Sequence, residues 1–291
     1  MGKKDLTEKI LLDWNDVFAD VFNSLIFNGK EIMKPEELEN VSPVSVYKVD
    51  ESRKGELREQ IRDVVKIWRN SAFRIAFCGI ENQTSVDKFM PLRVIGYDGA
   101  TYRSQLPGKK TTKPCPVVTL VLYFGKGLWT GPRSLSECLD IPDFLAPYVS
   151  DYRINVIEIG QLSPEQIACM KSDFRIIADF FAQSEQMGEY KQKSTLKFKH
   201  REEMLHFFSV FTNDDRFESI EKGANSMCEI LDKVENKGRL EGRLEGRVEG
   251  REERIAKERT HVKAMMKNLH ISLDEAMLIL EIPASEKDLF I

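Results

Sequence analysis

The sequence has little of what a thiolate metal site or a membrane anchor requires. It contains four histidines and five cysteines, and the cysteines form no C-x-x-C pair. Neither a disulfide framework nor a zinc site is indicated, so a bound metal would take oxygen ligands, as Mg²⁺ or Mn²⁺ does. The most apolar run, residues 117–124, is far below the roughly 20 residues that span a bilayer. We therefore expect no membrane span and a cytoplasmic location.

The sequence also lacks an excess of one charge. Its 43 Lys and Arg against 47 Asp and Glu give a net charge of −4, which argues against a wholly basic protein. Hydrophobic residues make up 42%, enough for one sizeable core and a smaller second unit. We predict a domain over residues 1–212, a helical segment over 213–260 and a small helical tail over 261–291.

The first half has the pattern of an α/β core. Apolar residues at helical spacing predict a helix over 7–28, which Asn28-Gly29 would end. Two β-like runs, 61–68 and 73–81, are close enough to form an antiparallel hairpin. A helix over 87–105 and a buried strand over 117–124 should follow.

The second half is predicted to be mostly helical. One more strand is expected over 153–159. Ser163 and Gln166 form a capping box for a helix that should continue through an apolar stripe to Phe181. A basic stretch over 191–201 precedes another apolar helix, and two short helices should close the chain after Ser272.

A four-residue repeat, Gly-Arg-Leu-Glu, runs from Gly238 to Arg251. Four residues advance a helix by about 40° beyond one turn, so the Leu and Val positions form a drifting ridge. Each glycine costs about 1 kcal/mol relative to alanine, which predicts a marginal helix. It is either a tether or a segment ordered by packing against a second copy, where glycines would let the backbones approach closely. A homo-oligomer is one expected outcome.

The hairpin brings polar residues together. Side chains alternate along a strand, so Glu81 and Gln83 share one face while Asn82 lies on the other. Asp63, on the neighbouring strand, should come opposite them. Two carboxylates and an amide are a minimal set for holding a hard divalent cation against a phosphate. Such spacings are common, and a purely structural role is the alternative.

Six blocks of the sequence carry a resemblance to a known family, namely residues 15–23, 79–83, 90–93, 117–125, 131–135 and 151–155. In this order, over roughly residues 12–185, they resemble the Rpn family of recombination-promoting nucleases and transposase-like proteins, which belongs to the PD-(D/E)XK nuclease superfamily. The C-terminal repeats are also typical of that family. The resemblance implies a restriction-endonuclease-like α/β core, a mixed central sheet flanked by helices, with an α-helical C-terminal extension.

The resemblance also assigns roles. Asp63 and Glu81 would be catalytic metal ligands for Mg²⁺ or Mn²⁺, with the backbone carbonyl of Asn82 as a further ligand. Gln83 stands where the superfamily usually has lysine, and a neutral amide gives less electrostatic support to the reaction.

Two further residues match supporting positions of the family. Asp16 would be an auxiliary carboxylate from the first helix, and Gln105 would brace the site from the end of the second helix.

The implied function is a metal-dependent DNA endonuclease that hydrolyses phosphodiester bonds in recombination or on mobile elements. Gln83 motivates a second hypothesis, a catalytically weak or inactive DNA-binding or regulatory protein on the same fold. A third is an interaction module in which the repeats are the working part. DNA phosphates would be neutralised by Arg93, Arg103, Lys109, Lys110, Lys113, Lys193, Lys197 and Lys199.

Overall fold

The computed structural model divides the chain into two compact units, Met1–Ile230 and Leu231–Ile291. The finer borders expected at residues 212 and 260 stay a prediction. The structure describes residues 10–41, 44–48, 57–61, 63–70, 73–106, 113–187, 196–220, 223–224 and 226–290.

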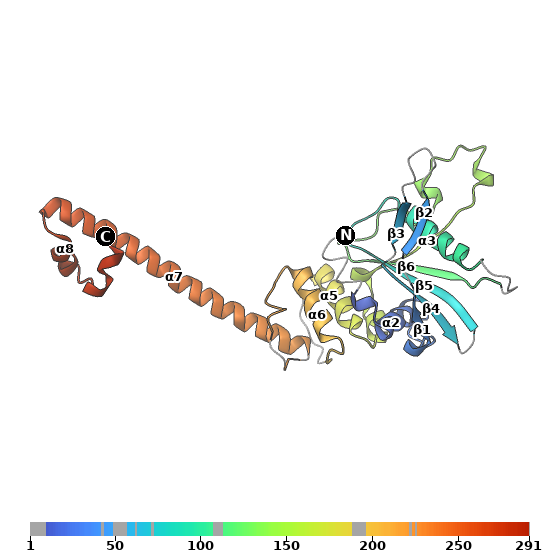
Figure 1. Cartoon of the computed structure of the whole chain (residues 1–291), viewed down its shortest axis with the longest axis horizontal. Coiled ribbons are helices and arrows are strands. Elements are labelled where there is room, and N and C mark those ends of the chain that lie inside the picture. Colours follow the sequence, from blue (N-terminus) through green and yellow to red (C-terminus); the bar gives the residue numbers. More distant parts are fainter. Residues whose placement is uncertain are drawn as a thin grey trace. The chain divides into compact units, whose positions relative to one another are not determined.

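A mixed five-stranded sheet forms the centre of the first unit (Figure 1). Its first three strands are antiparallel neighbours and its last three are parallel neighbours. The hairpin expected between residues 61 and 81 is confirmed. The strand order is β1 (Leu38–Asn40), β4 (Val64–Asn70), β5 (Phe73–Gln83), β6 (Val117–Tyr123) and β7 (Asn155–Glu158).

A second, two-stranded sheet was not anticipated. It consists of β2 (Val44–Lys48) and β3 (Leu57–Ile61), which pair in antiparallel fashion. Ile61 therefore ends β3 instead of opening the hairpin, which is a correction to the predicted strand over 61–68.

The two helices that matter most cover opposite faces of the central sheet (Figure 1). From α2 (Asn15–Leu25), the ring of Phe18 lies 5.6 Å from Lys66 Nζ. From α3 (Met90–Ser104), Arg93 reaches Glu81. Lys66 pairs with Cys78, three positions before Glu81, and an odd spacing on a strand means opposite faces. The expected restriction-endonuclease-like α/β core is therefore confirmed.

The helix predicted over 7–28 is interrupted, because residues 10–12 are helical whereas Asp13 and Trp14 are not. Trp14 has an extended backbone, and its ring stacks on His200 with centroids 4.3 Å apart, so α2 begins only at Asn15. Helix α2 ends at Leu25, three residues before the predicted stop, and Asn28 and Gly29 turn the chain with φ of 52° and 79°. Gly29 is required there, since an added Cβ would lie 2.9 Å from Cys169 Sγ.

The helix predicted from Ser163 is confirmed at its start but is divided into two. The capping box opens α4 (Pro164–Cys169), and α5 (Phe174–Met187) follows after a break. The break has a distant cause. The buried carboxylate of Asp20, on α2, accepts hydrogen bonds from the backbone N–H groups of Lys171 (2.9 Å) and Ser172 (2.7 Å). Helix α6 (Arg201–Thr212) completes the helical side.

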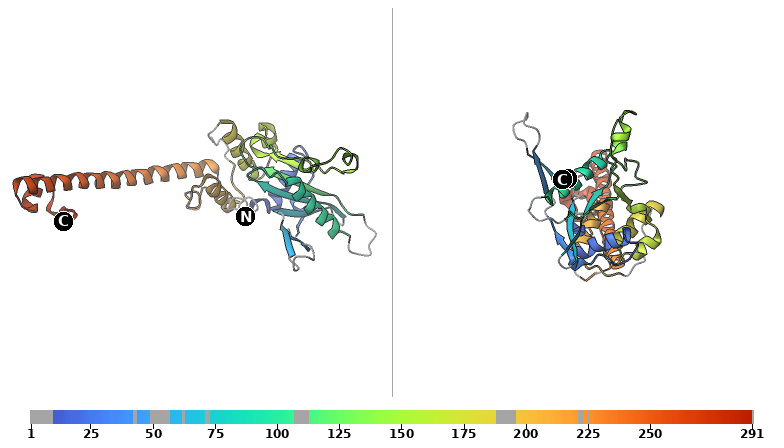
Figure 2. Two further views of the ribbon diagram at one scale, coloured as in Figure 1. Left: turned by 90° about the horizontal axis from the view of Figure 1, so that it is seen from above. Right: turned by 90° about the vertical axis from the view of Figure 1, so that its right-hand side faces the viewer.

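The second unit contains most of α7 (Met227–Leu269), a single unbroken helix that includes the repeats (Figure 2). Its C-terminal part packs against α8 (Leu273–Ile279), which the predicted Ser272 capping box opens, and against the 3-10 turn Ala284–Leu289. Among the described helices, none has the length and apolar character needed to cross a membrane. The buried cluster comprises Val262, Ala276, Met277, Ile282 and Phe290.

Candidate active site

The register of β4 and β5 brings the two predicted acids together. Val64 pairs with Ile80, so Asp63, which directly precedes β4, comes opposite Glu81. Asp63 Oδ2 accepts a hydrogen bond of 2.8 Å from the backbone N–H of Asn82. The two residues are 8% and 0% exposed. We call Asp63 and Glu81 the acidic pair.

Helix α3 closes over the acidic pair through Arg93. The guanidinium donates to Glu81 Oε2 at 3.4 Å and to Asp87 Oδ2 at 3.0 Å, and it lies 3.4 Å from the hydroxyl of Tyr97. Burial would lower the pKa of Arg93, but its bonds to Tyr97 and Asp87 and the charge of Glu81 outweigh burial and raise it. Arg93 therefore stays charged beside Glu81.

Tyr97, whose hydroxyl lies 3.4 Å from Arg93, is the next titratable side chain beside the acidic pair. Its pKa is raised first by burial and then by the negative charge of Glu81, with a smaller contribution from Asp63, while Arg93 opposes the shift. The phenol is therefore neutral and can donate or accept a hydrogen bond beside the acidic pair.

A buried polar contact fixes α3 on the sheet. Asp98, 2% exposed, accepts hydrogen bonds from the hydroxyl of Thr119 on β6 (2.7 Å) and from the hydroxyl of Tyr152. Met90 and Val94 pack on Val121 in the same layer. The position of Arg93 over the acidic pair is thus held by both polar and apolar contacts.

The donor set of the acidic pair fits a hard divalent cation. It offers two carboxylates and the backbone carbonyl of Asn82, all oxygen ligands, as Mg²⁺ and Mn²⁺ prefer. Within the described ranges, no group of three or more His, Cys, Asp or Glu side chains could hold a metal ion. Two carboxylates are enough for an ion such as Mg²⁺, which usually keeps several waters and takes one or two protein carboxylates.

Gln83 and Asn82 complete the end of β5. Gln83 lies on the same face as Glu81 and is partly exposed, and its backbone carbonyl accepts from Phe124 N–H at 2.8 Å. The side chain of Asn82 points to the other face, is 3% exposed and makes no hydrogen bond to a described residue. Only the backbone of Asn82 therefore belongs to the candidate site.

Two predicted supporting residues are not brought to the acidic pair. Asp16 lies on the opposite face, where it accepts from Lys199 Nζ and His200 Nε2 at 2.9 Å each. Gln105 follows Arg93 by twelve positions, about 18 Å along a helix. Its amide bonds the backbone of Cys115 at 2.9 and 3.1 Å, so it closes the loop after α3.

The predicted DNA-binding residues are dispersed. Arg93 contacts the acidic pair, whereas Arg103 and Lys113 are exposed elsewhere. Lys109, Lys110 and Lys193 lie outside the described residues.

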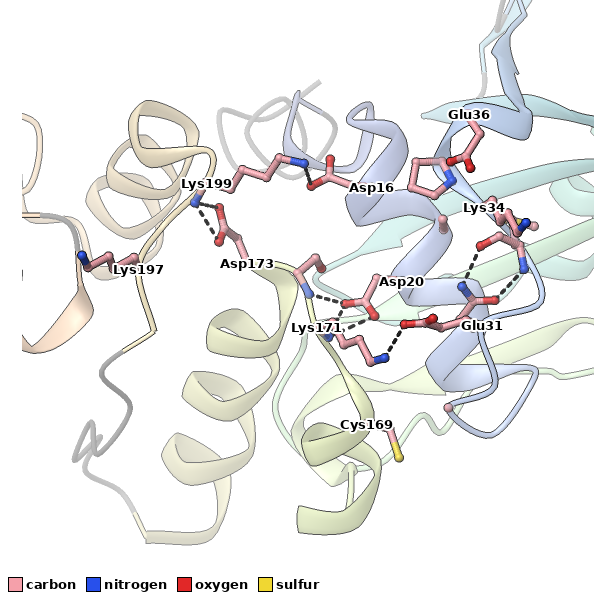
Figure 3. Close-up of a pocket in the computed structure, with 16 residues that line it drawn as sticks. Asp16, Asp20, Glu31, Lys34, Glu36, Cys169, Lys171, Asp173, Lys197 and Lys199 are labelled. Atoms are coloured by element: carbon pink, nitrogen blue, oxygen red, sulfur yellow. Dashed lines mark hydrogen bonds and ion pairs between the residues drawn. The ribbon is translucent and has the colours of Figure 1, made fainter.

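Lys197 and Lys199 line a cavity of about 500 Å³ beside α2 (Figure 3). Five carboxylates and four lysines line this cavity, and Lys199 is paired with Asp16. The positive charge of the lysines is therefore largely offset by neighbouring carboxylates. The acidic residues lining the cavity are Asp16, Asp20, Glu31, Glu36 and Asp173.

Two sets of contacts on the central sheet, one beside the candidate site and one on the opposite face, were not predicted from the sequence. Tyr97 follows Arg93 by four positions, the spacing at which helical side chains meet, so that pair could have been found. Lys66 is fully buried and donates to the Asp13 carbonyl at 2.7 Å and to Asn40, and burial lowers its pKa. Nothing in the local sequence indicates those partners.

The fold and the acidic pair define a restriction-endonuclease-like α/β protein. The model of a family described as "Putative transposase, YhgA-like" matches residues 29–193. The chain belongs to this family, and the match includes Asp63, Glu81 and Gln83. Comparisons with curated proteins and with solved structures give no match.

Proposed function

We propose that this protein is a metal-dependent DNA endonuclease, acting in recombination or on mobile elements in the cytoplasm. The observation that supports it is the acidic pair. Asp63 and Glu81 meet on one face of the β4–β5 hairpin, inside the region that the transposase family covers. Paired carboxylates next to a charged guanidinium are suited to phosphodiester chemistry.

In this proposal, Asp63, Glu81 and the Asn82 carbonyl hold Mg²⁺ or Mn²⁺. The bound ion would supply an activated water and neutralise charge on the phosphate. The backbone N–H of Asn82 orients Asp63 by donating a hydrogen bond of 2.8 Å to its Oδ2. Arg93, held by Asp87 and Tyr97, adds fixed positive charge beside Glu81, and Gln83 can donate a hydrogen bond without charge.

Nicking of supercoiled plasmid in Mg²⁺ or Mn²⁺ tests the proposal. Asp63→Asn and Glu81→Gln remove charge at nearly constant size, and each should lower the rate by at least about 100-fold. Asp16→Asn is the matched control, because its carboxylate lies on the other face of the sheet and should not affect cleavage. Unchanged cleavage in the first two variants would refute the assignment.

The second candidate is a DNA-binding or regulatory protein on the same fold. It is favoured by the neutral Gln83 and by the full burial of Glu81 against Arg93. Plasmid binding without nicking in either metal, measured by gel shift on the wild-type chain, would select this candidate over the enzyme.

A further inference from the structure

The repeat segment of α7 exposes an apolar ridge that no part of its own unit covers in the described structure. Leu240, Leu244 and Val248 are 59%, 52% and 56% exposed, although leucine and valine gain most from burial. The apolar residue recurs every four positions over three consecutive repeats, with leucine in the first two and valine in the third. A recurring exposed ridge on one helix indicates a partner surface.

The helical geometry places each residue type of the repeat on its own side. Residues two apart are separated by about 200°, so the glycines lie opposite the ridge. Residues one before and one after the ridge fall on its two flanks. Arg243 and Arg247 therefore border it on one side, and Glu245 and Glu249 border it on the other.

We propose that this ridge pairs with the same ridge of a second copy of this chain, with the two helices parallel. In a parallel pair, opposite flanks of the two helices face each other, so each arginine flank meets a glutamate flank. In an antiparallel pair, identical flanks would meet and like charges would repel. The charge pattern thus selects both the partner and its orientation.

The pairing differs from a long coiled coil. A four-residue repeat exceeds 3.6 residues per turn, so the ridges cross with a right-handed angle and touch over only a few turns. The glycines face outward, and a Cβ added at Gly242, Gly246 or Gly250 would meet nothing within 4 Å. This arrangement replaces the expectation that glycines form the contact.

The first test is the mass of the full chain by light scattering over a range of concentrations. The wild type should give twice the chain mass, and a Leu240→Ser, Leu244→Ser, Val248→Ser variant should give the monomer mass. These side chains are exposed in the single chain, and circular dichroism checks that the variant keeps its fold. The control, Gly242→Ala with Gly246→Ala, should stay dimeric and gain helix.

A monomeric wild type would overturn the proposal, as would a serine variant that stays associated or an alanine control that dissociates. The orientation has its own test, oxidative cross-linking of Leu240→Cys and Val248→Cys, each alone, with the wild type as baseline. Parallel helices give covalent dimers in both. Cross-links that form only when the two variants are mixed would show antiparallel helices and refute the parallel pair.

Discussion

Arg93 controls the charge of the acidic pair in this structure. It lies 3.4 Å from Glu81 and is positioned by Asp87 and Tyr97. It was expected to contact DNA phosphate, yet in the chain alone it neutralises the carboxylate that the proposal assigns to a metal. If the proposal is correct, Arg93 and a divalent cation would compete for Glu81.

Arg93→Ala should strengthen Mn²⁺ binding while weakening DNA cleavage. The pair joins a fully buried Glu81 to an Arg93 that is 39% exposed, so its loss should raise the affinity by at least about fivefold, the equivalent of about 1 kcal/mol. Titration followed by the electron paramagnetic resonance signal of free Mn²⁺ measures it. Arg103→Ala, in the last turn of the same helix, should leave Mn²⁺ affinity unchanged, and a drop in Mn²⁺ affinity in Arg93→Ala would contradict the competition.

Gln83→Lys should raise the nicking rate by about tenfold. A charged amine on the same face of β5 as Glu81 would stabilise the negative charge that develops on the phosphate. Single-turnover nicking at saturating Mg²⁺ isolates this effect from metal binding. A slower Gln83→Lys enzyme with intact metal binding would show that the neutral amide is suited to this site.

Asp16 supports stability and not the candidate site. Burial raises its pKa, but hydrogen bonds from Lys199 and His200 and their charges outweigh burial, so its pKa is lowered from 3.8. A carboxyl with a lowered folded pKa stabilises the protein above its unfolded pKa and loses that contribution as pH falls through the folded value.

Asp16→Asn should therefore reduce the free energy of unfolding by about 1 kcal/mol at pH 6. The difference from the wild type should shrink as the pH falls below about 3.8. Urea unfolding at several pH values measures it. A difference that stays constant down to pH 3 would mean that the carboxylate charge is not involved.

At the scale of elements, the alternation of apolar residues along strands and the capping motifs of helices predicted the local structure. The hairpin that joins Asp63 to Glu81 follows from two β-like runs with a short connection, and the Ser163 and Ser272 capping boxes form as expected. The break between α4 and α5 could not be predicted, because Asp20 that causes it is 151 residues away in sequence from Lys171. The contact of Arg93 with Glu81 could not be predicted either, because it depends on how α3 packs on the sheet.

Asp20→Asn should destabilise the α4–α5 junction. One carboxylate accepts from two backbone N–H groups, and a buried charged hydrogen bond contributes about 2 kcal/mol. Hydrogen exchange should show faster exchange at Lys171 and Ser172 with little change on β5. Asp143→Asn, on an exposed loop, serves as control and should alter neither. Unchanged protection at Lys171 and Ser172 in Asp20→Asn would contradict the stated cause of the break.

At the scale of the whole molecule, the charge distribution limits where DNA could bind. The chain carries a net charge of −4, and the cavity beside α2 sets five carboxylates against four lysines, so it offers little net positive charge. The acidic pair, under α3, has Arg93 as its neighbouring cation. On this account a phosphate approaches the α3 face, and a bound divalent cation must first offset the charge of the pair.

Metal binding by the full chain tests the central claim most directly. Isothermal titration with Mn²⁺ should give one site per chain that is lost in both Asp63→Asn and Glu81→Gln and kept in Asp16→Asn. Equal binding by all four proteins would contradict the claim that Asp63 and Glu81 together hold the cation.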